Sequence, residues 1–302
     1  MSPVRVALVT GATGFVGGHL VQRLLVDGWD THAIVRPSSN ATTLRDVLGN
    51  GNVHAHDGST VELIDILRSV RPDVVFHLAS VVVAEHSTDD VDPLVQSNIL
   101  FGTQLLEAMT VAGVSAIVNT GTYWQHYEGR EYSPVSLYAA TKQAFQDILQ
   151  FYCEARSLRA VTLELPDTYG PGDKRPKLFS LLDQAARSGE TLQMSPGEQL
   201  LDLLHVDDVT HGYEVAADGL LTGHLPSPSQ YQLSSGSLVR LKDVVELYRQ
   251  ATGRAVSVAW GGRPYRVREV MEPRSPMPVL PDWNPSKSLV KWLADLAAAT
   301  AK

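Results

Sequence analysis

The stretch "TGATGFVGGHL", residues 10–20, decides the fold of this chain. It follows a β-branched run that predicts a strand over Val4–Val9, and it opens an apolar segment with helical spacing, Phe15–Asp27. The spacing G-x-x-G-x-x-G lets the backbone approach a pyrophosphate, which the free N–H groups of the helix start then face. A plain tight turn is the alternative, but a strand before and a helix after the glycines favour a dinucleotide site. These glycines are Gly11, Gly14 and Gly17.

Outward from that turn, short apolar runs alternate with helical stretches. We expect further strands at Thr31–Val35, Val53–His56, Val74–His77, Ala116–Asn119 and Ala160–Leu165. We expect further helices at Val61–Ser69, Pro93–Ala112 and Leu137–Arg156. Alternation at this spacing predicts βαβ units and an α/β fold with a doubly wound parallel sheet of the Rossmann type. Apolar runs such as "VVFHLA" fit strands that helices cover on both faces.

The alternation ends near residue 166, where the proline- and glycine-rich loop "PDTYGPGDKRPK" begins. A predicted helix, Leu178–Ser188, follows, and "LLHVDDV" has the pattern of a strand that leads into another helix. From Ser237 onward we expect a helix, a short strand in "AVSVAW", the basic loop "GGRPYRVRE" and a last short helix. The predicted division is a nucleotide-binding domain over 1–166, to which 200–235 returns, and a smaller mixed substrate lobe over 167–199 and 236–302.

The composition is that of an ordinary globular protein, and it argues against several kinds of partner. The chain has 302 residues, 44% of them hydrophobic and 19% charged, which is ample for a full core. A net charge of -8 without a basic run argues against nucleic acid as the main partner. No apolar segment approaches the ~18 to 20 residues that cross a bilayer, and the first residues lack a signal-peptide layout. With one cysteine, Cys153, we expect a cytoplasmic protein in which this thiol is a small buried hydrophobe.

Two strand ends bear on the choice of cofactor. The second strand ends in "AIVRPSSN", where Arg36 and Ser39 occur at the place that an NAD site gives to an acidic residue. A guanidinium matches a 2′-phosphate, so the sequence predicts NADPH; an ordinary exposed arginine is the alternative. The third strand ends in "HAHDGS", where Asp57 can accept a hydrogen bond from an adenine amino group. The histidines show no metal-type cluster, so no metal site is predicted.

Hydroxyl groups and one amine supply the candidate chemistry. In "LYAATKQAF", residues 137–145, Tyr138 and Lys142 are four residues apart in a segment that favours a helix, so they share a face. A cation beside a phenol favours the phenolate and lowers the tyrosine pKa, which suits a proton donor. "VNTGTYW" brings Thr120 and Thr122 to the carboxyl end of the sheet, where α/β sheets bind ligands. The alternatives are a half-buried tyrosine with a solvated lysine, and strand-end threonines that cap local backbone.

Together these motifs resemble the extended short-chain dehydrogenase/reductase family, in its nucleotide-sugar 4-ketoreductase, CDP-abequose synthase-like branch. The likeness spans nearly the whole chain through "GATGFVGGHL", "FHLAS", "SNILFGTQLLEA", "LYAATKQAF", "YGPGD" and "LLHVDDV". It implies that Thr122 polarises a substrate carbonyl, that Tyr138 exchanges the proton, and that Lys142 holds the nicotinamide ribose and lowers the tyrosine pKa. It also implies a homodimer that pairs the helices Pro93–Ala112 and Leu137–Arg156.

The resemblance also implies which residues meet the two ligands. Those expected at the cofactor are Gly11, Thr13, Gly14, Phe15, Val16, Gly17, Arg36, Ser39, Asp57, Gly58, Leu78, Ala79, Tyr138, Lys142 and Leu165. Those expected at the substrate are Val81, Thr122, Tyr123, Trp124, Lys177, Arg263 and Arg266.

Departures from the family pattern sharpen the prediction. Sugar-nucleotide 4,6-dehydratases follow the strand-end threonine with Asp-Glu, but Tyr123 and Trp124 occur here, so elimination of water lacks its proton carriers. Leu201 replaces an arginine that often precedes Asp202, and Asp167 replaces an asparagine that often precedes "YGP". A carboxylate at residue 167 would repel a diphosphate. Candidates to supply the missing charge are Lys177, Arg263 and Arg266, with a solvated surface charge as the alternative for each.

We therefore expect NADPH-dependent reduction of the 4-keto group of a dTDP- or CDP-linked 4-keto-deoxyhexose, in deoxysugar biosynthesis. A nucleotide-sugar 4-epimerase with tightly held NAD needs the same residues, and Arg36 argues against it. A non-catalytic dinucleotide sensor needs no acid, so Tyr138 beside Lys142 argues against that alternative. The expected partners are a nucleotide-diphosphate sugar and a second copy of the chain, without nucleic acid or membrane. The nucleobase, the sugar and the stereochemistry of the new hydroxyl depend on the second lobe, and the sequence leaves them open.

Overall fold

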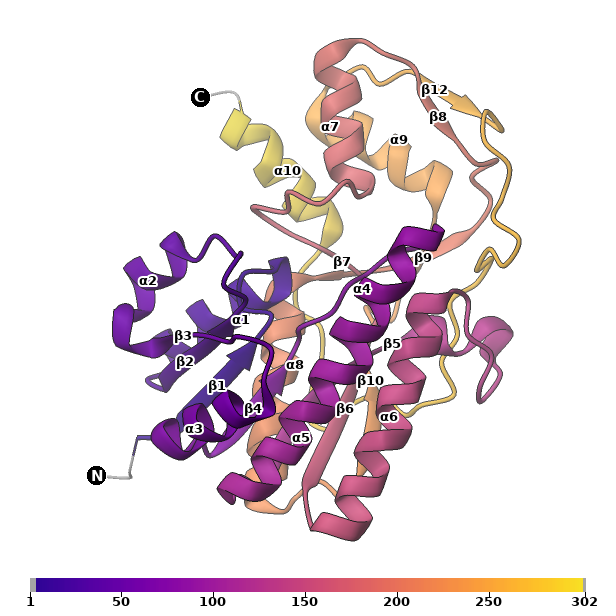
Figure 1. Cartoon of the computed structure of the whole chain (residues 1–302). Coiled ribbons are helices and arrows are strands. Elements are labelled where there is room, and N and C mark those ends of the chain that lie inside the picture. Colours follow the sequence, from indigo (N-terminus) through magenta and orange to yellow (C-terminus); the bar gives the residue numbers. More distant parts are fainter. Residues whose placement is uncertain (1–3, 301–302) are drawn as a thin grey trace.

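A seven-stranded, all-parallel sheet dominates the computed structural model, which describes residues 4–300 (Figure 1). Its order is β10 (Ser229–Gln232), β6 (Arg159–Leu165), β5 (Ala116–Thr122), β4 (Val74–His77), β1 (Val6–Thr10), β2 (Asp30–Val35) and β3 (Val53–Ala55). The chain runs outward from β1 through β2 to β3 and then restarts at β4 on the other side of β1. Ligands of such sheets bind at the carboxyl ends of the strands where the order reverses, here between β1 and β4. The predicted doubly wound fold is confirmed.

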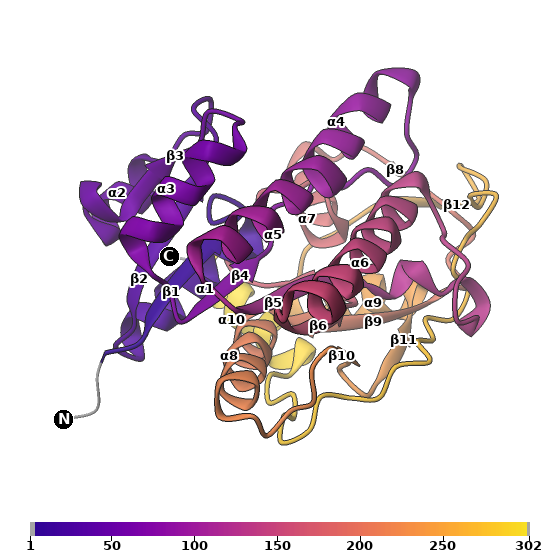
Figure 2. The same ribbon diagram turned by 60° about the horizontal axis from the view of Figure 1, so that its bottom comes forward.

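Helices cover both faces of this sheet (Figures 1 and 2). One face carries α3 (Thr60–Val70), α5 (Phe101–Ala112) and α6 (Leu137–Arg156), and the other carries α1 (Phe15–Val26) and α8 (Val206–Thr222). In β4, Val74 and Phe76 join the α1–α8 core, whereas Val75 joins the α3–α5–α6 core. Successive side chains of a strand point to opposite faces, so a strand buried on both sides is apolar throughout. Cys153 packs against the α3–α5–α6 core, and burial raises its thiol pKa to about 11, as suits an inert hydrophobe.

The helix expected over Pro93–Ala112 is interrupted. The chain forms α4 (Val91–Val95), a π-helical turn over Gln96–Leu100, and then α5. Such π-turns insert an extra residue into a helix and occur frequently at functional sites. This one holds Asn98, which is buried, and so it places a polar side chain on the inner face of an otherwise apolar helix.

A smaller lobe lies above the carboxyl edge of the sheet (Figure 1). Its strands form one sheet of β7 (Asp167–Tyr169), β9 (Leu200–His205) and β11 (Leu238–Arg240), and a pair of β8 (Leu192–Met194) with β12 (Val258–Trp260). Its helices are α7 (Leu178–Ser188), α9 (Leu241–Thr252) and α10 (Leu289–Thr300). A core that includes Leu182, Val245, Tyr248 and Leu293 joins these helices. The short helix α2 (Thr42–Leu48), together with β7, β8, β10 and β11, is absent from the sequence prediction.

The chain passes between the two parts more than once. β9 pairs with β7 and β11 in the small sheet, and α8 and β10 then pack with the large sheet. By its pairing β9 belongs to the small sheet, although its Leu204 packs in the α1–α8 core of the large sheet. The predicted division, in which 200–235 returns to the first domain, stays a prediction. Within residues 4–300, no helix combines the length and the apolar character that crossing a membrane requires.

Candidate active site

The glycine turn between β1 and α1 is closed so tightly that side chains do not fit. A Cβ on Gly11, whose φ is +73°, would lie 2.6 Å from the backbone nitrogen of Ala79. A Cβ on Gly17 would lie 2.2 Å from the carbonyl oxygen of Gly11. The turn thus brings the start of α1 against the ends of β1 and β4, with Leu78 and Ala79 beside it, and leaves bare backbone facing the carboxyl edge. This is a cradle of the kind that receives a pyrophosphate at a helix N-terminus.

The other residues predicted for the cofactor lie along the same edge. Thr13 is exposed, and Phe15 and Val16, at the start of α1, are half-buried. Arg36 follows β2 directly and is exposed, and the Ser39 N–H donates to its carbonyl oxygen to close a turn. Gly58 has a φ of +101° after β3, and Leu165 is the register partner of Thr122 between β6 and β5. Since parallel strands end on the same side, these residues share one edge of the sheet.

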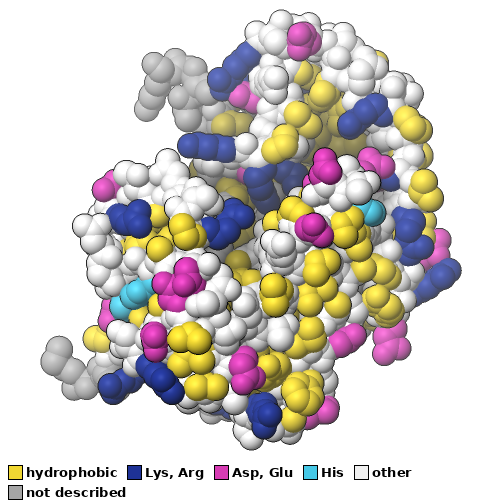
Figure 3. Space-filling view, viewed as in Figure 1, with side chains coloured by type: hydrophobic (Ala, Val, Ile, Leu, Met, Phe, Trp, Pro, Cys, Tyr) yellow, Lys and Arg dark blue, Asp and Glu magenta, His cyan; other side chains and the backbone are white. Residues whose placement is uncertain are grey.

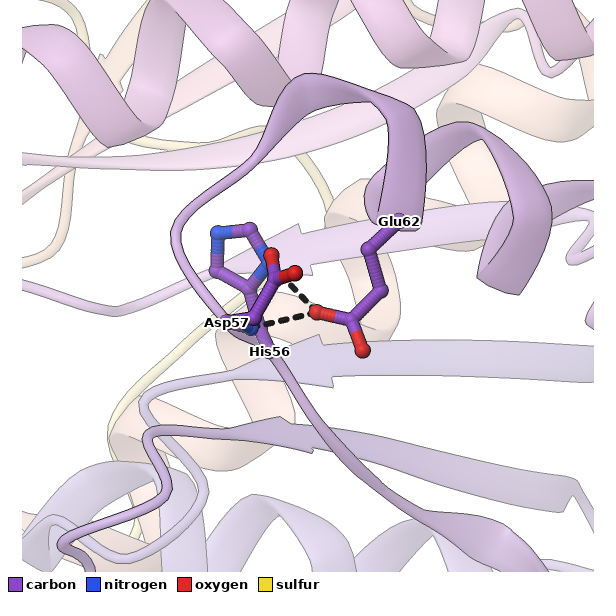
Figure 4. A group of neighbouring side chains, drawn as sticks. All are labelled: His56, Asp57 and Glu62. Carbon is purple, nitrogen blue, oxygen red and sulfur yellow. Dashed lines mark hydrogen bonds and ion pairs between the residues drawn. The ribbon is translucent and has the colours of Figure 1, made fainter.

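The end of β3 also gathers His56, Asp57 and Glu62 (Figure 4). Their potential ligand atoms lie within 4.8 Å of one another. The carboxylates already serve the start of α3: Glu62 accepts the Asp57 N–H, and Asp57 accepts the Ser59 N–H at 2.7 Å. His56 Nδ1 lies 3.5 Å from Glu62, and the imidazole ring lies 5.4 Å from that of Phe101. Burial lowers the His56 pKa, although Glu62 and Asp57 oppose this. We assign the group to helix capping and core packing rather than to a metal.

Thr122, Tyr138 and Lys142 come together at the end of β5, and we call these three residues the reacting group. Ser136 caps α6 by accepting the Ala139 N–H, which begins the helix just before Tyr138. The Thr122 hydroxyl accepts the Trp124 N–H at 3.3 Å, and its proximity acts to lower the Tyr138 pKa. All three residues are buried, and Lys142 is only 4% exposed. The structure thus places the predicted hydroxyls and amine in one small group.

The prediction that Lys142 lowers the pKa of Tyr138 is wrong in this structure. Burial raises the pKa of Tyr138 to about 12, and among the described residues only the hydrogen bond with Thr122 opposes this rise. Burial also lowers the pKa of Lys142 to about 8, because a charged amine loses its hydration there. The spacing of the two groups follows from a local helical pattern, whereas their burial does not, and burial is the largest effect on both pKa values. At neutral pH the phenol is protonated and can donate.

Two further buried polar residues at the site were missed by sequence reasoning. Asn98 donates to the Val81 carbonyl and to the Thr141 hydroxyl, at 2.9 Å each, and accepts the Val81 N–H at 2.8 Å. His77 shares a 2.9 Å hydrogen bond with Thr10, and burial beside Lys142 lowers its pKa to about 3. A polar residue on the inward face of a predicted helix was the signal for Asn98. The network fixes Val81, a residue expected to meet the substrate.

On the substrate side, the Asp167 carboxylate is paired with a cation and a phenol. Lys177 Nζ is 3.3 Å from one carboxylate oxygen, and the Tyr123 hydroxyl donates to the other at 3.2 Å. Burial and the nearby Asp167 charge raise the pKa of Tyr123 well above its ordinary value, so Tyr123 stays a donor. The expected repulsion of a diphosphate at residue 167 is thus offset by Lys177. Tyr123 and Asp202 line a narrow pocket together with Arg274, which the sequence prediction did not include.

Cations and an aromatic ring form the rim of the site. The guanidinium of Arg266 lies 5.5 Å from the ring centroid of Trp124, which in turn meets the Tyr138 ring edge to face at 6.4 Å. Arg263 is exposed, and its backbone N–H donates to Met194 in the small lobe. Figure 3 shows a hollow between the two parts of the molecule, with Lys and Arg side chains along it. The structure thus brings Arg266 next to Trp124, whose ring contacts that of Tyr138.

A buried ion pair joins the segment after Thr122 to the rest of the site. His126 Nε2 lies 2.7 Å from Glu164, whose other oxygen accepts a hydrogen bond from Ser275. Burial opposes the imidazolium, but the hydrogen bond and charge of Glu164 raise the His126 pKa overall. The pair connects β5, β6 and the C-terminal passage near the substrate pocket.

Comparison with known proteins agrees with this geometry. Residues 7–224 match the model of the family described as "NAD dependent epimerase/dehydratase family". The chain belongs to this family. Its glycine cradle and its Thr122–Tyr138–Lys142 group lie in the matched residues, as does its large sheet except for β10 and the first residue of β1. A nicotinamide dinucleotide is therefore the cofactor that the residues at the carboxyl edge fit.

Individual relatives refine this assignment. A CDP-abequose synthase of Yersinia pseudotuberculosis is 27% identical over 274 residues, covering 88% of this chain and 90% of the relative. A UDP-glucose 4-epimerase of Mycolicibacterium smegmatis is 29% identical over 233 residues, covering 68% of this chain and 71% of the relative. The solved structure of MoeE5 in complex with UDP-glucose and NAD is 26% identical, with a TM-score of 0.81 and 98% of each chain covered. The predicted family and its CDP-abequose synthase-like branch are confirmed.

Proposed function

We propose that this chain catalyses the NADPH-dependent reduction of the 4-keto group of a dTDP- or CDP-linked 4-keto-deoxyhexose. The observation that carries the proposal is the pair of buried hydroxyls, Thr122 at the end of β5 and Tyr138 at the start of α6, in a site where Tyr123 and Trp124 follow the threonine. Two hydroxyl donors suit a carbonyl that is being reduced, whereas elimination of water needs carboxylates that these two positions lack. The CDP-abequose synthase relative supports the same substrate class.

The residues of the site would act on the substrate oxygen. Thr122 would donate to the carbonyl oxygen as that oxygen gains negative charge, and Tyr138 would transfer its proton to it. Lys142, on the same face of α6 one turn further along, would hold the nicotinamide ribose. When bound, the nicotinamide would supply the hydride that reduces the carbonyl carbon. Tyr138 is protonated at neutral pH, so it meets the first requirement of a general acid.

Arg36 supports NADPH over NADH. It is exposed at the end of β2, and residues 4–300 offer it no ion-pair partner within reach of its side chain. A guanidinium that is free of a carboxylate can bind a 2′-phosphate bidentately. The preference stays a proposal, because the solved relatives hold NAD.

An assay of NADPH oxidation against CDP- and dTDP-linked 4-keto-deoxyhexoses tests the proposal. We expect oxidation with one sugar of the panel, and release of NADP⁺ in equal amount to the new hydroxyl. Absence of oxidation with every 4-keto sugar would overturn it.

A 4-epimerase is the second candidate, because the Mycolicibacterium smegmatis relative is a UDP-glucose 4-epimerase and MoeE5 was solved with UDP-glucose and NAD. An epimerase regenerates its cofactor within each turnover. Purified protein that retains NAD and converts UDP-glucose to its 4-epimer, without net release of reduced or oxidised cofactor, would favour this candidate over the reductase.

We also propose a cytoplasmic homodimer that pairs the α4–α5 segment with α6. Hydrophobic side chains gather over these helices in Figure 3. The exposed ones are Val91, Val95, Leu100, Val111 and Phe151. Phe151, 54% exposed, should lie in the interface, so Phe151→Glu should give a monomer in sedimentation where wild type gives a dimer. Val26→Glu, on the opposite face, is the control; a monomeric wild type at micromolar concentration would contradict the proposal.

A further inference from the structure

A fully buried glutamine lies directly beside the candidate reacting group. Gln125 is 0% exposed, in the 3₁₀ turn Tyr123–Gln125 that follows β5. Buried amides need partners for every hydrogen-bonding group, because each unpaired one loses its hydration without compensation. The partners of Gln125 therefore show what its position requires.

All three hydrogen-bonding groups of the Gln125 amide are used. Its Oε1 accepts the Thr122 N–H at 3.0 Å. Its Nε2 donates to the Oε1 of Gln143 at 2.9 Å and to the Oε1 of Gln146 at 3.1 Å. Gln143 is itself oriented, because its own amide donates to Asp147 at 2.9 Å. One side chain thus joins the backbone of Thr122 to two residues of α6.

This bridge joins the two elements that carry the reacting group, β5 and α6. Thr122 ends β5, whereas Gln143 and Gln146 lie on α6, the helix that also carries Tyr138 and Lys142. Glycine at residue 121 leaves room for the amide. A Cβ there would lie 3.2 Å from Gln125 Oε1 and 3.1 Å from side-chain atoms of Glu164 and Thr162. Neither leucine nor glutamate offers one acceptor toward β5 and two donors toward α6.

We propose that Gln125 is a positioning residue, which sets the separation between the Thr122 and Tyr138 hydroxyls by tying β5 to α6. The inference rests on the proposed function, since it assigns those two hydroxyls to a single substrate oxygen. The Gln125 side chain acts through the backbone N–H of Thr122, and the backbone N–H groups of Gln125 and Trp124 donate to the Thr122 hydroxyl. Displacements of about 1 Å in such groups cost roughly 10²-fold in rate.

Gln125→Met tests this role, because methionine keeps the length of the side chain and removes all three hydrogen bonds. We expect kcat to fall about 10- to 100-fold, while KM for the sugar nucleotide and Kd for NADPH stay within about twofold. Thr162→Val is the control: it removes a buried 3.2 Å hydrogen bond that Asn119 of β5 donates to β6, three residues before Thr122, and leaves the bridge from β5 to α6 intact. Equal losses of kcat in the two variants, measured on folded protein, would overturn the proposal.

A double variant separates positioning from general destabilisation. If Gln125 acts through Thr122, Gln125→Met should lower kcat by no more than about twofold in a Thr122→Val background, because residues that act as a unit are not additive. A full 10- to 100-fold loss in that background would refute action through Thr122.

A crystal structure of Gln125→Met keeps the inference testable if the proposed function fails. Should wild type reduce no 4-keto sugar, the assay result counts against the proposed reaction alone. The distance between the Thr122 and Tyr138 oxygens in wild type and variant then decides the role of Gln125. We expect a longer distance in the variant; an unchanged distance overturns the inference.

Discussion

The reacting group at the end of β5 and the basic loop over residues 261–269 both contain cationic side chains, but the cation is buried in the first and exposed in the second. Lys142 is 4% exposed, and burial lowers its pKa to about 8. Arg266 is exposed, next to Val267, which is 100% exposed. In the first region burial is the largest effect on the pKa values of Tyr138 and Lys142. In the second region, water screens each charge. Substitutions in the first region should therefore change kcat strongly, and those in the second should change KM modestly.

Tyr138→Phe should show the largest effect. It removes the phenolic proton donor and keeps the ring that meets Trp124 edge to face, so the fold and NADPH binding should persist. General acid catalysis is typically worth ~10²–10⁴-fold, and we expect kcat to fall by that amount. Steady-state kinetics with the active 4-keto sugar measures the loss.

The same substitution further along the same helix is the control. Tyr152 donates to Glu107 at 2.9 Å on the far part of α6, so Tyr152→Phe should leave kcat within about twofold. Turnover of Tyr138→Phe within a few-fold of wild type would remove Tyr138 from the reaction.

Lys142→Met should abolish efficient turnover and yet stabilise the protein. The folded state lowers the Lys142 pKa from 10.5 to about 8, so the buried charge opposes folding at neutral pH. At about 1.4 kcal/mol for each pKa unit, its removal should raise the free energy of unfolding by on the order of 1–3 kcal/mol. Thermal unfolding without cofactor at pH 7 measures the gain, and a lower Tm in the variant would contradict it.

The pH dependence gives an independent check of the sign. Between pH 8 and 10.5 the unfolded state binds more protons at Lys142 than the folded state does, so stability should rise with pH through this window. Below pH 8 the lysine is charged in both states and its contribution is constant. Lys142→Met should lack this rise, and the difference between the two unfolding curves isolates the lysine from other titrating groups.

The comparison also shows what sequence alone can predict. Thr122, Tyr138 and Lys142 were predicted because each follows from a local pattern: a strand end, or two residues one helical turn apart. Asn98 and Gln125 were not, since their roles arise from partners distant in sequence, such as Val81 and Gln146. In the small lobe, strands β7, β8 and β11 have three residues each, too few for a period to appear.

Arg36→Asp tests whether the exposed Arg36 binds the 2′-phosphate of NADPH. Wild type should bind NADPH more tightly than NADH, because a charge-assisted hydrogen bond to the 2′-phosphate is worth about 1.5–3 kcal/mol, or about tenfold or more in Kd. The variant should reverse the order, since aspartate repels the phosphate and accepts from the ribose hydroxyls. Fluorescence titration with both cofactors measures this, and Arg45→Asp, on the exposed surface of α2, is the control. Equal affinities in wild type would make Arg36 an ordinary surface residue.

Arg266→Ala should have the smallest effect, and it tests whether the basic loop meets the substrate at all. The Arg266 guanidinium lies 5.5 Å from the Trp124 ring, at the rim of the reacting group, where an arginine can bind diphosphate oxygens. Because the side chain is exposed, we expect about 1 kcal/mol, or about fivefold in KM, with kcat and NADPH affinity unchanged. Arg263→Ala is the matched control from the same loop: its backbone is tied to Met194, away from Trp124, so KM should change less. An unchanged KM in Arg266→Ala would make the loop a solvated surface, and the diphosphate would then be sought at Lys177, or at Arg274, which lines the pocket beside Tyr123.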